Sequence, residues 1–124
     1  MLVDDSEADL LFTQLVLERS GAGWEVLAFE SAEAALDHLR QPGHGVSLIL
    51  LDINMPGMNG FEFLEAYEQL PRSGHPVVVM LSSSPLARDR ERAMAFGCVR
   101  GYVTKPIDRE QALALLQWLP APGA

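Results

Sequence analysis

Three acidic residues, one serine and the only lysine of the chain stand where short apolar runs of the sequence end. Asp4 and Asp5 follow the first run, Asp52 the third, Ser82 the fourth and Lys105 the fifth. Carboxylates that come close together raise one another's pKa values unless a cation joins them. Their oxygen atoms suit Mg²⁺, which takes one or two protein carboxylates and keeps several waters. A carboxylate nucleophile, Mg²⁺ and a lysine can together accept a phosphoryl group, since that transfer needs mainly positioning and charge neutralisation.

Asp52 is the best candidate for the nucleophile. It follows the nearly continuous apolar run 46–51, which is typical of a strand buried on both faces. The loop of proline and glycine residues that leads to Gly60 keeps the space above Asp52 open. Each residue alone has a simpler explanation, because an aspartate after a strand often caps the next helix and Lys105–Pro106 could be an ordinary turn. The prediction of a phosphoryl-accepting site therefore depends on the combination of these residues and not on any one of them.

The elements that must position these residues alternate along the chain. Five strand–helix units predict an α/β fold with a parallel sheet covered by helices on both faces. The carboxyl ends of such strands meet at one rim, where ligands bind. Strands are predicted over residues 2–3, 24–29, 46–51, 77–81 and 100–104, and the first, second and last helices are capped by Ser6, Ser31 and Asp108.

Apolar residues recur at helical spacing in three of the predicted helices. In the first helix, Asp9 also stands where a capping box has its acid, as a short substitute for glutamate. The apolar positions are Leu10, Leu11, Leu15 and Leu17 in the first helix, Ala34, Ala35, Leu36 and Leu39 in the second, and Ala112, Leu113, Leu115, Leu116 and Leu119 in the last.

Four motifs together are similar to the receiver domain of two-component response regulators, of the CheY type. They are Val3–Asp5, Leu50–Gly60, Ser82 and Tyr102–Pro106, and the similarity extends over essentially all 124 residues. It implies a flavodoxin-like, doubly wound fold of three layers, (βα)5, with the parallel strand order 2-1-3-4-5.

The resemblance also implies roles for individual residues. Asp52 would be the phosphoacceptor, served by a histidine kinase or a phosphotransfer protein. Asp5, Asp52 and the backbone carbonyl of Asn54 would hold Mg²⁺ or Mn²⁺, with Asp4 supporting the ion through water. Lys105 would contact the phosphoryl oxygens. The activity implied is self-phosphorylation and self-dephosphorylation, with no other enzymatic turnover.

A switch and an output surface follow from the same resemblance. Ser82 would move its hydroxyl onto the phosphoryl group, and Tyr102 would then rotate inward. Together they would reshape the face made by the fourth helix, the fifth strand and the fifth helix, where a downstream protein or a second copy would bind. Pro106 would follow a cis peptide bond.

The first strand is short for the central place that the resemblance gives it. Only Leu2 and Val3 precede the acidic pair, whereas strands commonly run about 5–6 residues. Two explanations stay open: residues upstream of Met1 are missing, or the strand is unusually short and costs stability.

Composition limits the remaining possibilities. The 124 residues are 48% apolar, so we expect one receiver domain over residues 1–119 and a Pro-rich tail or linker start at 120–124. The net charge of −8 argues against direct binding of nucleic acid. The apolar runs are far shorter than the ~20 residues that span a bilayer, and the lone Cys98 excludes an internal disulfide, so we expect a cytoplasmic protein.

Other functions remain as alternatives. A degenerate receiver could serve for docking only. A phosphohydrolase with an aspartate nucleophile, of the haloacid dehalogenase kind, would need an acid two residues after Asp52, where this chain has Asn54. A nucleotide-binding protein would need glycines after the first strand, where this chain has acidic residues. Whether the domain is a stand-alone regulator or part of a larger regulator or hybrid kinase stays open.

Overall fold

The computed structural model describes residues 1–70, 76–83 and 87–119. The tail proposed for residues 120–124 lies outside these residues. The elements in chain order are β1 (Leu2–Val3), α1 (Glu7–Arg19), β2 (Ala28–Phe29), α2 (Ala32–Leu39), β3 (Leu48–Leu51), α3 (Gly60–Glu68), β4 (Val77–Ser82), α4 (Ala87–Met94), β5 (Val99–Thr104), α5 (Arg109–Ala114) and the 3₁₀ helix η1 (Leu115–Trp118).

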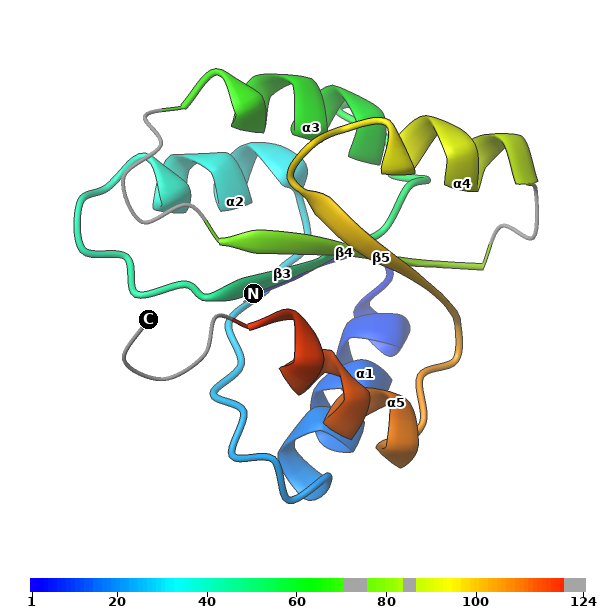
Figure 1. The fold of residues 1–124 in the computed structure, drawn as a ribbon. Helices are drawn as coiled ribbons and strands as arrows, with labels where there is room; N and C mark the ends of the chain where they lie inside the picture. The colour runs from blue at the N-terminus through cyan, green and yellow to red at the C-terminus, as the bar shows by residue number, and fades with distance from the viewer. Residues whose placement is uncertain (71–75, 84–86, 120–124) are drawn as a thin grey trace.

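The strands form one parallel sheet in the order β2-β1-β3-β4-β5. Helices α1 and α5 cover one face of this sheet, and α2, α3 and α4 cover the other (Figure 1). The predicted fold class and strand order are therefore confirmed. Because all five strands run in the same direction, their carboxyl ends lie along one edge of the sheet.

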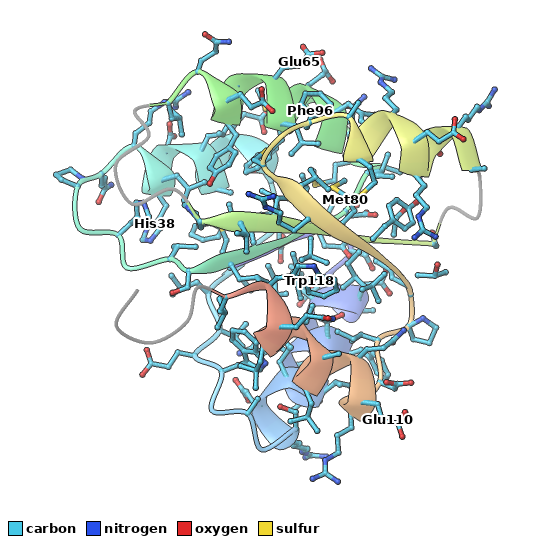
Figure 2. The ribbon with its side chains drawn as sticks, viewed as in Figure 1. His38, Glu65, Met80, Phe96, Glu110 and Trp118 are labelled. Atoms are coloured by element: carbon cyan, nitrogen blue, oxygen red, sulfur yellow. The ribbon has the colours of Figure 1, made fainter. Side chains whose placement is uncertain are left out.

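The two faces of the sheet have separate apolar cores, which explains why β3 and β4 are continuous apolar runs. In β4, Val78 and Met80 join the core beneath α2 and α3, whereas Val79 and Leu81 join the core against α1 and α5. Figure 2 shows Met80 on the side of the sheet that faces α3 and α4. Successive side chains of a strand point to opposite faces, so a strand covered on both sides needs apolar residues throughout.

The helices present narrower apolar faces than the spacing of their residues predicts. Leu10 and Leu17 of α1 are buried, but Leu11 is 60% exposed and Leu15 is 38% exposed. A helix that lies flat on a sheet buries one stripe, and Leu11 and Leu15 lie on the opposite side of α1. Ala34, Leu113 and Leu116 are likewise exposed, although their helical spacing predicts that they lie on the inner, apolar faces of the second and last helices.

Strand β2 is shorter than predicted because its partner β1 has only two residues. Strand β3 begins at Leu48, which pairs with Val77 at the start of β4, rather than at residue 46. The segments 24–27 and 46–47 precede these strands, and no residue of β1 lies between them. These segments and Met1 line a groove of about 460 Å³. The amino group of Met1 donates a hydrogen bond to the carbonyl of Leu48 (2.9 Å), and the Met1 carbonyl accepts one from Leu50 (2.8 Å). Met1 thus pairs as a strand residue would.

A longer first strand should stabilise the domain. Burial lowers the pKa of the Met1 amino group to about 6, so this group costs stability as the pH falls from 8 through 6. Adding four apolar, β-branched residues before Met1 would replace the amine with an amide and let the added strand enter the groove. We expect the melting temperature to rise by about 5 °C or more, and its fall between pH 8 and 6 to weaken. A Gly-Ser extension of equal length is the control, and equal melting temperatures for the two extensions would contradict this reading of the groove.

Candidate functional site

Three carboxylates meet at the carboxyl edge of the sheet. Asp4 and Asp5 follow β1 directly, and Asp52 follows β3, which pairs with β1. One carboxylate oxygen of each residue lies within 4.8 Å of the others. Asp4 and Asp52 are buried, whereas Asp5 is exposed. The pairing of two neighbouring strands therefore concentrates negative charge in one partly buried place.

Lys105 brings positive charge to this cluster from the end of β5. Its backbone N–H donates to the carbonyl of Ser82 (2.9 Å), which holds the start of the next loop against the end of β4. Its ammonium lies 2.5 Å from Asp4 Oδ2, 3.0 Å from Asp9 Oδ2 and 3.7 Å from Asp52 Oδ1. Burial lowers the pKa of Lys105, but its hydrogen bonds to Asp4 and Asp9 and the charge of Asp52 outweigh burial, and the pKa is raised overall.

Asp9 has a different partner from the one that its position in a capping box predicts. Ser6 does cap α1, since its hydroxyl accepts a hydrogen bond from the backbone N–H of Asp9 (3.2 Å). The Asp9 carboxylate, however, pairs with Lys105 across the site. Local spacing gives no signal for this contact, because Asp9 and Lys105 are 96 residues apart in the sequence.

The positive charge near Asp52 does not balance the negative charge of Asp52 and the neighbouring carboxylates. Burial raises its pKa to about 6, the charge of Lys105 and a hydrogen bond from the backbone N–H of Ile53 (2.9 Å) oppose that shift, and the charges of Asp4 and Asp5 add to it. One ammonium therefore does not neutralise this group of carboxylates. A divalent cation would, and the oxygen ligands present are those that Mg²⁺ accepts. The exposed Asp5 leaves one side of the cluster open to the waters that the ion keeps.

The other predicted site residues lie in β4 and β5 and in the loops that follow β3 and β5. Ser82 is fully buried at the end of β4. Tyr102 is half-buried in β5 and packs against the core under α2 and α3. Asn54 is exposed in the loop after Asp52, and the peptide bond before Pro106 is cis.

Gly60 lets the loop after Asp52 close on itself. Its N–H donates to the carbonyl of Ile53 (2.8 Å), and a Cβ at this position would lie 2.5 Å from the carbonyl oxygen of Asp52. Asn59 and Glu62 form a capping box that starts α3 at this point. The backbone of Asp52 is thus held in place by a contact that only glycine permits.

Residues 1–117 match the response regulator receiver domain among known protein families. The chain belongs to this family. Its place is in two-component signal transduction, and the resemblance seen in the sequence is confirmed.

Particular relatives agree with this assignment. The receiver domain is 34% identical over 121 residues to the sensor histidine kinase GacS of Pseudomonas protegens, which is 95% of this chain and 13% of that protein. The chain thus spans a small part of this relative. Among solved structures, a response regulator receiver protein from Dyadobacter fermentans is 38% identical, with a TM-score of 0.84 over 94% of this chain and 92% of the other. The Mn²⁺-bound form of the response regulator Rcp1 is 30% identical, with a TM-score of 0.76 over 97% and 96% of the two chains.

Within the described parts of the receiver domain, no helix has the length and apolar character needed to cross a membrane.

Replacing Gly60 with alanine should disturb the receiver domain at the site itself. The added methyl group would meet backbone atoms of Asp52 and Ile53, which cannot rotate away as a side chain could. We expect Gly60→Ala to lower the free energy of unfolding in urea by about 2 kcal/mol. The control is Gly97→Ala, because a Cβ at Gly97 would meet no atom within 4 Å. Equal stability of the two variants would contradict the close approach at Gly60.

The charge of Asp52 should cost stability when no metal is present. Its pKa is raised from 3.8 to about 6, so the folded domain binds this proton more tightly than the unfolded chain does, and stability is lost as the pH rises through 6. In EDTA at pH 7.5, Asp52→Asn should raise the melting temperature by roughly 5 °C, and this gain should shrink as the pH falls towards 4. A lower melting temperature for the variant at pH 7.5 would show that Asp52 is well neutralised without metal.

Proposed function

We propose that this receiver domain accepts a phosphoryl group on Asp52 from a histidine kinase or a phosphotransfer protein, in the cytoplasm and with Mg²⁺ bound. The observation that carries the proposal is the position of the Asp52 carboxylate between one ammonium and two further carboxylates at the edge of the sheet. This arrangement suits a site that must hold a nucleophile and a divalent cation side by side.

The transfer needs little chemistry from the protein beyond positioning and charge neutralisation. A carboxylate oxygen of Asp52 would attack phosphorus as the bond from phosphorus to the donor histidine nitrogen breaks, and the imidazole would leave with the bonding electron pair. Lys105, 3.7 Å from Asp52 Oδ1, is near enough to reach the transferred group after a small movement of its side chain. Mg²⁺, when bound, would neutralise charge on the carboxylates and on the phosphoryl oxygens.

The ligands proposed for the ion are Asp5, Asp52 and the backbone carbonyl of Asn54. Asp4 fits a supporting place, because both of its oxygens already accept hydrogen bonds: Oδ1 from the backbone N–H of Ser6 (2.9 Å) and Oδ2 from Lys105. Asp5 is exposed, which fits direct binding of a hydrated ion.

The output would pass through Ser82 and Tyr102 to the face made by α4, β5 and α5. Ala93 is the one buried residue of α4, so few contacts hold this helix in one position. Helix α4 and strand β5 also carry the exposed arginines Arg88, Arg90 and Arg100, beside the exposed acid Glu91, on a protein whose net charge is −8. Arg92 of α4 instead lies over the ring of Phe61 in α3, 4.0 Å from its centroid. A downstream partner with an acidic surface would fit this face, as would a second copy that aligns its own acidic groups with it.

Two alternatives accompany the proposal, one about the protein that contains the domain and one about its chemistry. The domain could act alone or within a larger regulator or hybrid kinase, as its similarity to one part of GacS suggests. A receiver used only for docking would keep the fold and not the chemistry.

Acetyl phosphate tests the chemistry without a kinase. The intact mass of the protein after incubation with acetyl phosphate and Mg²⁺ should show a gain of one phosphoryl group. The gain should disappear in EDTA and in Asp52→Asn, because one removes the cation and the other the nucleophile. Asp37→Asn is the matched control, since Asp37 is an exposed acid of α2 that pairs with Arg40.

A folded wild-type protein that gains no phosphoryl group would favour the docking-only receiver. A gain that persists in Asp52→Asn would place the acceptor elsewhere.

A further inference from the structure

We propose that Asp9 is a positioning residue that keeps Lys105 away from Asp52 in the unphosphorylated domain and so slows phosphorylation. The inference rests on the proposed function. It adds an inhibitory contact between Asp9, in the first turn of α1, and Lys105, and this contact is called the brake below. None of the roles that the family resemblance implies uses Asp9.

The ammonium of Lys105 lies near three carboxylates but donates hydrogen bonds to only two of them. It has three N–H donors, and it lies 2.5 Å from Asp4 and 3.0 Å from Asp9. Its distance of 3.7 Å to Asp52 Oδ1 is too long for a hydrogen bond. Both bonded partners belong to the β1–α1 side of the site, so they draw the ammonium away from the acceptor.

Asp9 is the partner that Lys105 can release at low cost. Asp4 is buried and is also fixed by the backbone N–H of Ser6, so losing its lysine would leave a buried charge poorly paired. The side chain of Asp9 is 49% exposed, so water can replace the ammonium there. A phosphoryl group on Asp52 would add negative charge on the far side of Lys105 and compete with Asp9 for it.

The contact between Asp9 and Lys105 therefore stabilises the unphosphorylated form selectively. A contact made in one state and given up in the other shifts the balance between them by its own free energy. A partly exposed, charge-assisted hydrogen bond of this kind corresponds to about a threefold to tenfold change in rate or equilibrium.

The test compares the initial rate of phosphorylation by acetyl phosphate and Mg²⁺ among variants. Asp9→Asn should be phosphorylated about three to ten times faster than the wild type. Glu7→Gln is the matched control: it removes the same charge from the same turn of α1 and should stay within twofold of the wild type. The control matters because losing any negative charge near the site also reduces repulsion of the anionic donor.

A double-mutant cycle shows whether Asp9 acts through Lys105. In a Lys105→Met background, Asp9→Asn should change the rate by no more than the twofold allowed for Glu7→Gln, since no ammonium is left to hold. The same cycle measured by urea unfolding of the metal-free protein should show Asp9→Asn destabilising the protein only when Lys105 is present. Mg²⁺ affinity, measured by titration calorimetry, should stay within twofold in Asp9→Asn.

The outcomes separate the inference from the proposed function. If the wild type is phosphorylated and Asp9→Asn is no faster than Glu7→Gln, or is slower, the brake is refuted and the proposed function stands. Acceleration that persists in the Lys105→Met background would refute action through the lysine. If the wild type takes up no phosphoryl group, the proposed function fails and the brake fails with it.

Discussion

The structure depends on a group of carboxylates that one ammonium cannot neutralise. Asp4 and Asp52 are each 6% exposed, and Asp5 stands beside them at the rim. Charges withdrawn from water need opposite charges or hydrogen bonds. Burial raises the pKa of Asp52 to about 6, and the charges of Asp4 and Asp5 add to that shift, which Lys105 opposes without cancelling it. The domain thus keeps a site with unbalanced negative charge, which a bound cation would neutralise before a phosphoryl group is accepted there.

The remainder of the fold holds this site rigidly on one side and loosely on the other. Strands β3 and β4 lie between two apolar cores, and Gly60 fixes the chain just beyond Asp52. Strand β1 is two residues long, and α4 buries little apart from Ala93. Asp52, the proposed nucleophile, is therefore fixed, while the helix proposed to carry the output is weakly held. That division suits a switch, because a small change at the site can shift only those elements that few contacts restrain.

The alternation of strand and helix patterns was enough to predict the parallel sheet, and the residue types at the strand ends were enough to predict the acidic cluster. Asp4, Asp5, Asp52 and Lys105 each follow a strand, and topology alone brings such positions together. Three features could not be predicted in this way. The length of β2 depends on its neighbour β1, the exposure of Leu11 depends on how α1 lies on the sheet, and the pairing of Asp9 with Lys105 joins segments 96 residues apart. Each is a tertiary contact that local spacing does not encode.

Titration of the metal-free domain with MgCl₂ by calorimetry at pH 7.5 tests the central claim most directly. If the carboxylates are short of positive charge, one ion should bind, and Asp5→Asn should weaken its binding by about tenfold or more. Glu65→Gln, on the outer side of α3 in Figure 2, should bind the ion as the wild type does. Absence of binding by the wild type, or equal affinity in Asp5→Asn, would contradict the account.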